Sequence, residues 1–333
     1  MADPDDERWM EAAVEAAARV RATAHPNPWV GCAIVDGQGL VAVGATRPPG
    51  QAHAEVDALE AAGPRADGAT AYVTLEPCSH HGRTGPCADA LVEAGIRRVV
   101  VAVTDPDPRV SGQGIERLRA AGVDVTVGPG AEAVERQLQA YLHQRRTGRP
   151  YVVLKLAATL DGRTAAPDGS SRWITGAAAR ADVHRLRAES DSIVVGAGTV
   201  RADDPSLTVR DAEGPDPERI VLGAAPAGAK VHPCTEWDGR LEDLLAELGR
   251  RGHVQTLFEG GATVAASLHR ARLVDRYVLY LAPALLGGDD GRGVFHGAGA
   301  ATIADAWRGR LDAVTRLGDD LRIDLTPDSE GTP

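Results

Sequence analysis

Four residues in the first third of the chain have the types and the spacing of a metal-dependent hydrolytic site. His53 and Glu55 are separated by one residue, and Cys78 and Cys87 follow, with a proline directly before Cys78. One imidazole and two thiolates can hold a zinc ion and leave its fourth position for water. The carboxylate of Glu55 can then move protons without binding the metal. We therefore predict a catalytic zinc site with His53, Cys78 and Cys87 as ligands and Glu55 as the acid–base group.

The spacing of the two cysteines separates this motif from its common form. Zinc deaminases that act on nucleobases combine the same groups, usually with two residues between the cysteines. Here eight residues separate Cys78 from Cys87. A structural zinc site is the alternative, because His80 or His81 could supply a fourth ligand and close the coordination shell. That alternative leaves Glu55 without a role, so the pattern favours catalysis.

The composition is that of a soluble globular protein with about two domains. The chain has 333 residues, of which 43% are hydrophobic and 25% are charged. Its net charge of -11 argues against a nucleic-acid-binding surface, and four cysteines are too few for a disulfide scaffold. The acidic N-terminus has no apolar signal core, and no apolar run reaches the length of a membrane span. We expect a cytoplasmic protein that binds neither nucleic acid nor membranes.

The metal-binding residues lie in a part of the chain where strands and helices alternate. We expect helices at 7–21, 52–62, 88–94, 115–121 and 131–145, and strands at 30–35, 40–45, 71–75, 98–103 and 123–127. His53 and Glu55 then lie in the first turn of one helix, and Cys87 opens another. Two helix N-termini can converge on one metal, where their partial positive charge favours thiolates. The core of this half should be a layered α/β sheet.

A boundary near residue 148 divides the chain into predicted domains 1–147 and 148–333. The second domain has expected strands at 151–157, 191–196, 219–223, 255–259 and 276–281, and an antiparallel pair around 314–316 and 321–325. Its expected helices are 177–188, 241–250 and 263–272. The glycine-rich turn at 258–263 could bind a phosphate through backbone N–H groups, although such turns also arise for steric reasons. Gly196-Ala197-Gly198 lacks the third glycine of a dinucleotide fingerprint, so we interpret it as a strand followed by a turn.

Throughout its length the chain resembles the bifunctional deaminase–reductase family of riboflavin biosynthesis. The resemblance rests on residues 27–32, 53–55 and 76–87 in the first half, the last of these including the long Cys–Cys insertion. In the second half it rests on residues 154–157, 161–164, 173–175, 203–205, 207–210 and 259–261. It implies two α/β domains: an N-terminal cytidine-deaminase-like α/β/α layer and a C-terminal domain similar in fold to dihydrofolate reductase.

The resemblance also implies two successive reactions on phosphorylated pyrimidine substrates. The first domain would hydrolyse the 2-amino group of a diamino-hydroxy-pyrimidine that carries a phosphoribosylamino substituent. Zinc would lower the pKa of a bound water, and Glu55 would act as general base and then as general acid. The second domain would reduce the ribosyl group to ribityl with hydride from NADPH.

Binding residues follow from the same resemblance. The implied NADPH contacts are Ala157, Trp173, Thr199, Asp203 and Gly261. The implied substrate contacts are Asn27 and His80 in the first domain, and Lys155, Ser171, Arg187, Leu207, Arg210 and Glu259 in the second. We also expect a homo-oligomer that forms through the reductase domain.

Two departures from the family pattern keep alternatives open. Gly85 stands where the family commonly has proline, and the segment between Arg210 and Glu259, which normally helps to build the adenosine side of the cofactor site, is shorter. One alternative is therefore a deaminase whose C-terminal domain has lost reductase activity and serves oligomerisation. A nucleic-acid base deaminase should show the short cysteine spacing and a basic face, and this chain has neither. A non-catalytic zinc-stabilised binding protein predicts that Glu55→Gln changes nothing.

Overall fold

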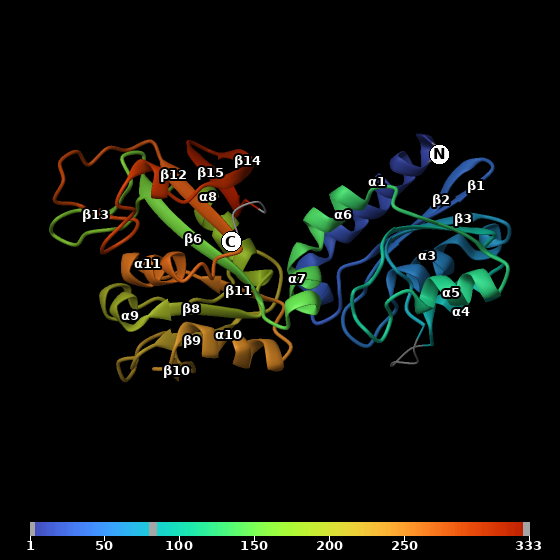
Figure 1. Ribbon diagram of the computed structural model, residues 1–333, viewed down its shortest axis with the longest axis horizontal. Coiled ribbons are helices and arrows are strands. Elements are labelled where there is room, and N and C mark those ends of the chain that lie inside the picture. The colour runs from blue at the N-terminus through green and yellow to red at the C-terminus, as the bar shows by residue number, and fades with distance from the viewer. Residues whose placement is uncertain (1–3, 80–84, 329–333) are drawn as a thin grey trace. The chain divides into compact units, whose positions relative to one another are not determined.

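The computed structural model describes residues 4–79 and 85–328, and the chain divides into two compact units. The first unit spans Met1–Gly148 and the second spans Arg149–Pro333 (Figure 1). Both units combine helices with a β-sheet, so the expected fold class, two α/β domains, is confirmed. Among the described residues, no helix combines the length and the apolar character that crossing a membrane requires.

A five-stranded mixed sheet forms the centre of the first unit. Its strand order is β2-β1-β3-β4-β5. The strands are β1 (Gly31–Asp36), β2 (Gly39–Ala45), β3 (Thr70–Leu75), β4 (Arg98–Val103) and β5 (Asp124–Val127). Strand β1 runs antiparallel to β2 and β3, whereas β3, β4 and β5 are parallel. The central strands are near-continuous apolar runs because helices bury both of their faces.

Helices cover both faces of this sheet. They are α1 (Pro4–Arg19), α2 (Arg21–Ala24), α3 (Ala54–Ala62), α4 (Cys87–Glu93), α5 (Gln113–Ala120), α6 (Ala131–Gln137) and α7 (Gln139–Thr147), with a 3₁₀ turn at Gly63–Ala66. Helices α1 and α6 lie side by side on one face, and α3, α4 and α5 line the other (Figure 1). The helix expected at 131–145 is two helices, because Leu138 leaves the helical conformation with φ -91° and ψ 11° and buries its side chain.

The second unit is built on an eight-stranded sheet with the order β10-β9-β8-β11-β6-β12-β15-β14. The strands are β6 (Tyr151–Thr159), β8 (Ser192–Gly196), β9 (Glu218–Leu222), β10 (Thr235–Trp237), β11 (Gln255–Phe258), β12 (Arg276–Ala282), β14 (Gly309–Leu317) and β15 (Asp320–Pro327). All pairs from β10 to β12 are parallel, and β15 and β14 extend the sheet antiparallel. Strands β7 (Arg163–Ala165) and β13 (Arg292–Gly293) form a separate two-stranded sheet.

The helices of the second unit bury apolar faces against this sheet. They are α8 (Ala177–Ala188), α9 (Ala197–Asp203), α10 (Leu241–Arg250) and α11 (Ala262–Arg270), with a 3₁₀ turn at Ile303–Asp305. Leucines 244, 245 and 248 of α10 pack in a core with Ile220 and Phe258. The chain enters α9 directly after β8 ends at Gly196, so a helix stands where we expected a turn. The carboxyl ends of β8, β11 and β6 therefore lie next to one another, where open parallel sheets bind ligands.

Candidate active sites

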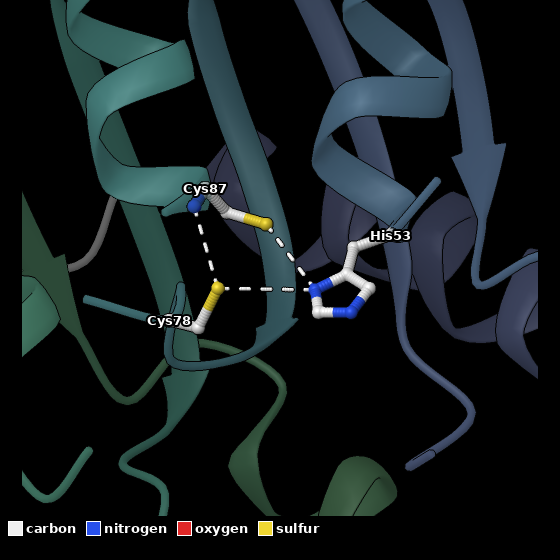
Figure 2. A group of neighbouring side chains, drawn as sticks. All are labelled: His53, Cys78 and Cys87. Atoms are coloured by element: carbon white, nitrogen blue, oxygen red, sulfur yellow. Dashed lines mark hydrogen bonds between the residues drawn. The ribbon is translucent and has the colours of Figure 1, made fainter. Parts of the chain in front are cut away.

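His53, Cys78 and Cys87 converge on one point in the first unit (Figure 2). Nδ1 of His53 lies 3.8 Å from Sγ of Cys78 and 3.4 Å from Sγ of Cys87, and all three ligand atoms lie within 4.8 Å of one another. Nitrogen and sulfur ligands arranged tetrahedrally around a zinc ion are about 3.6 Å apart. The donor set and its spacing therefore fit zinc, and within residues 4–79 and 85–328 the group consists of these three ligands.

Two helix N-termini and one strand end position these ligands. His53 is the N-cap residue of α3, Cys78 follows β3, and Cys87 is the first residue of α4. The backbone N–H of Cys87 donates to Sγ of Cys78 at 3.3 Å, which holds the two thiols together. The expected convergence of two helix starts is confirmed. His53 lies one residue before its helix, because its backbone is extended at φ -76° and ψ 167°.

The two cysteines differ in their acidity. A hydrogen bond from Cys87 lowers the pKa of Cys78. Hydrogen bonding to Cys78, together with burial, raises the pKa of Cys87 well above its usual range. The same contact with Cys78 raises the pKa of His53, so the three ligand side chains are electrostatically linked.

Glu55 lies in the first turn of α3 and lines the same pocket as His53 and Cys78. Its side chain is buried, and burial raises its pKa to about 7. A carboxyl group with a pKa near neutrality can both accept a proton and return it at physiological pH. The pocket has a volume of about 150 Å³, and Asn27 also lines it. His80 lies outside the described residues.

Sequence reasoning missed a second set of pocket-lining side chains. These side chains are Asp105, Asp107, Arg109, Tyr141 and Arg145. The Tyr141 hydroxyl donates to both oxygens of Asp105, at 3.0 and 3.2 Å, and Arg109 donates two hydrogen bonds to Asp107, at 3.0 and 2.6 Å. The signal available in the sequence was the position of Asp105 and Asp107 directly after β4, a parallel neighbour of the strand that leads to Cys78.

In the second unit, Lys155, Arg187 and Glu259 form one charged cluster. Arg187 donates two hydrogen bonds to the Glu259 carboxylate, at 2.7 and 3.0 Å, and Nζ of Lys155 lies 3.8 Å from the same carboxylate. Burial raises the pKa of Glu259, but Arg187 and Lys155 outweigh this effect and hold the pKa below its usual value. Burial lowers the pKa of Lys155. Three residues expected to bind substrate are thus brought together from β6, α8 and the end of β11.

The segment that contains Leu207 and Arg210 lies beside this cluster. Arg187 donates to the backbone carbonyl of Thr208 at 3.1 Å, and the backbone N–H of Arg210 donates to Nδ1 of His184 at 3.2 Å. Leu207 is buried and has a φ of 55°, a conformation that is costly for a leucine and bends the chain sharply. Helix α8 therefore holds both residues next to Arg187.

Thr199 and Gly261, two of the expected cofactor residues, are neighbours at the starts of α9 and α11. A Cβ atom on Gly261 would come within 3.3 Å of Oγ1 of Thr199, so the two helix starts approach closely. Ala157 lies on β6, two residues beyond Lys155 and therefore on the same face of the sheet.

Trp173 and Asp203 are linked through Arg172. Nε of Arg172 lies 3.9 Å from the Asp203 carboxylate, and the guanidinium groups of Arg172 and Arg180 lie 5.8 and 4.7 Å from the Trp173 ring. The Trp173 ring is exposed, and Ser171 is half-buried directly before Arg172.

Comparisons with known proteins match both units. A family model described as the cytidine and deoxycytidylate deaminase zinc-binding region matches residues 3–103, and one described as the RibD C-terminal domain matches residues 150–323. The riboflavin biosynthesis protein RibD of Escherichia coli strain K12 is 41% identical, over 96% of this chain and 99% of its own length. The chain belongs to the RibD family. As a RibD protein it is a bifunctional enzyme of riboflavin biosynthesis, with a zinc-dependent deaminase domain and an NADPH-dependent reductase domain.

Solved structures agree with this family assignment. Form 1 of Acinetobacter baumannii RibD is 40% identical and superposes with a TM-score of 0.91, covering 98% of this chain and 99% of that one. A diaminohydroxyphosphoribosylaminopyrimidine deaminase/5-amino-6-(5-phosphoribosylamino)uracil reductase from Thermotoga maritima is 31% identical with a TM-score of 0.86, covering 97% of this chain and 98% of that one. The RibD fold therefore extends over at least 97% of this chain.

Proposed function

We propose that the chain first deaminates 2,5-diamino-6-(5-phosphoribosylamino)pyrimidin-4-one and then reduces the ribosyl group of the product to ribityl with NADPH. The main support is the presence, in one chain, of the His–Cys–Cys group with its buried carboxyl and of the buried cluster around Glu259. The Thermotoga maritima relative, 31% identical, is described as carrying both activities.

The residues of the first unit would divide the deamination between them. His53, Cys78 and Cys87 hold the zinc, which when bound supplies a Lewis acid that lowers the pKa of water. Glu55 takes a proton from that water and later returns one to the departing ammonia, a role that its burial and its pKa of about 7 support. Asn27, together with His80, orients the pyrimidine ring.

The residues of the second unit would bind NADPH and the deaminated substrate side by side. NADPH lies along Ala157, Trp173, Thr199, Asp203 and Gly261, and the free backbone N–H groups at the start of α11 hold one of its phosphates. The substrate contacts are Lys155, Ser171, Arg187, Leu207, Arg210 and Glu259. Bound NADPH would supply a hydride to the C1 carbon of the sugar; the bond between C1 and the ring oxygen would break, and that oxygen would take up a proton as a hydroxyl group.

We propose that copies of the chain associate through the second unit. Strand β14 is at the edge of its sheet, and Leu311 and Val314 on it are 57% and 54% exposed. An edge strand with exposed apolar side chains is a site where another chain can pair. Sedimentation of the wild type and of Val314→Lys tests the proposal, and an unchanged mass would exclude this edge.

A cytoplasmic location is also proposed. The described cysteines are free thiols, and two of them must remain reduced to bind zinc. The net charge of -11 supports small-molecule substrates over nucleic acid.

A two-stage assay on the purified protein tests both reactions. Ammonia release is measured first with the diamino-pyrimidine phosphoribosyl substrate, and the absorbance of NADPH is followed after its addition. Ammonia release followed by NADPH oxidation is the expected result. Ammonia release without NADPH oxidation would instead favour a deaminase whose second domain serves oligomerisation, which is the function that the short segment between Arg210 and Glu259 would suggest.

A further inference from the structure

The carboxylate of Glu76 is buried at the end of β3 and accepts four backbone hydrogen bonds. One oxygen accepts from Gly114 at 2.9 Å and from Ile115 at 3.3 Å. The other accepts from Gly112 at 2.9 Å and from Asp105 at 3.3 Å. The side chain is only 4% exposed, so these N–H groups take the place of water around the carboxylate.

These four donors belong to one continuous part of the chain, the loop after β4 and the first turn of α5. The same loop supplies Asp105, Asp107, Arg109 and Val110 to the lining of the deaminase pocket. Glu76 itself lies two residues before Cys78. One side chain therefore links the turn that carries a metal ligand to the loop that lines the rest of the pocket.

A second contact holds the same two segments together. Gly114 lies so close to the backbone that a Cβ atom there would be 1.9 Å from the carbonyl oxygen of Pro77 and 3.3 Å from the Glu76 carboxylate. Any other residue at position 114 would push α5 away from the Pro77–Cys78 turn. The separation of the two segments is thus set by backbone contact and by the Glu76 hydrogen bonds together.

We propose that Glu76 is a positioning residue of the deaminase site. Its carboxylate fixes the loop at 105–110 at the distance from the metal ligands that the substrate needs in order to fit between them. The inference rests on the proposed deaminase activity and adds Glu76, a pocket-lining residue whose two carboxylate oxygens are taken up by backbone N–H groups. Glu76 acts by holding the backbone that presents Asp105 and its neighbours.

Two substitutions separate this role from a general structural one. Glu76→Gln keeps the size of the side chain, but its NH₂ group faces backbone N–H donors and at least one of them loses its acceptor. Glu76→Asp keeps the charge, but it is one methylene shorter and cannot reach both ends of the loop. Glu132→Gln is the matched control, because Glu132 is an exposed carboxylate on α6 of the same unit.

The test measures KM and kcat for ammonia release, zinc content and NADPH oxidation with pre-deaminated substrate in the full-length protein. For Glu76→Gln we expect KM to rise roughly tenfold or more, with kcat within about threefold of the wild type. Glu76→Asp should show an intermediate KM, and Glu132→Gln should match the wild type. Zinc content, NADPH oxidation and the visible spectrum of the cobalt-substituted protein should not change in any variant.

Several results would overturn the positioning role. An unchanged KM in both Glu76 variants would do so, as would a fall in kcat alone. A changed cobalt spectrum or lost zinc would place the effect of Glu76 on the metal ligands or on folding instead. Absence of ammonia release by the wild type would refute the proposed function itself, so the two failures are distinguishable.

Discussion

The Glu259 carboxylate offsets two cations inside the second unit, and we predict that Glu259→Gln destabilises this unit. The side chains of Glu259, Arg187 and Lys155 are 9%, 11% and 18% exposed, so water screens their charges poorly. Glutamine has nearly the same shape but no charge. The substitution therefore leaves a guanidinium and an ammonium group buried beside each other without an anion.

The size of the effect follows from these contacts. Removal of one partner from a buried ion pair costs about 3–5 kcal/mol. Arg187 keeps its hydrogen bond to the Thr208 carbonyl, and Lys155 can lose its proton because burial already lowers its pKa. We therefore expect the lower end, about 3 kcal/mol, which for a unit of this size lowers Tm by about 6–12 °C.

Calorimetry of the full chain at several pH values measures this loss, with Glu213→Gln as an exposed control in the same unit. A lysine whose pKa is lower in the folded state binds fewer protons there than in the unfolded chain. The free energy of unfolding therefore rises with pH until the pH reaches the pKa of lysine in the unfolded chain, about 10.4. In Glu259→Gln the pKa of Lys155 falls further, and this rise should begin at lower pH. A variant within 1 kcal/mol of the wild type, with the same pH dependence, would refute the reasoning.

Three further predictions concern the first unit. Glu55→Gln should abolish ammonia release while zinc stays near one per chain by atomic absorption; full activity would show that Glu55 is not the acid–base group. Cys78→Ser should lose zinc and lower the Tm of the first unit, with NADPH oxidation of pre-deaminated substrate unchanged. Hydrogen bonds from Arg109 lower the pKa of Asp107 to about 2, so its contribution is present above pH 4 and is lost as pH falls toward 2. Arg109 is exposed, so solvent screening reduces the effect. Between pH 4 and pH 2 the free energy of unfolding should fall by about 1 kcal/mol more in the wild type than in Asp107→Asn. Equal decreases in the two proteins would contradict the lowered pKa of Asp107.

The convergence of His53, Cys78 and Cys87 could be predicted from sequence because each of them belongs to a short local motif. His53 and Glu55 lie one residue apart at a helix start, and Cys87 opens the next helix. Metal ligation imposes residue types that few other roles require. The alternation of apolar runs with helical segments likewise predicted most strands and helices in both units, as the observed boundaries confirm.

The structural features that could not be predicted from the sequence depend on contacts between distant segments. The donors to Glu76 lie 29 to 39 residues away and are backbone groups, which leave no trace in residue type. The break of the helix at Leu138 is decided by burial of that side chain, and local propensity favours continuation. Strand β10 is only three residues long, too short for a periodic signal.

The sheet of the second unit has a consequence for synthesis on the ribosome. Strand β6 is the first part of that sheet to emerge, yet its neighbours β11 and β12 begin roughly 100 residues later in the chain. At about 5–20 residues per second, β6 waits at least several seconds without either partner. The first unit, by contrast, is complete once Gly148 has emerged and can fold during this interval. We expect the nascent chain to acquire its zinc pocket before its central apolar strand is covered, so Tyr151–Thr159 remains accessible to chaperones throughout this interval.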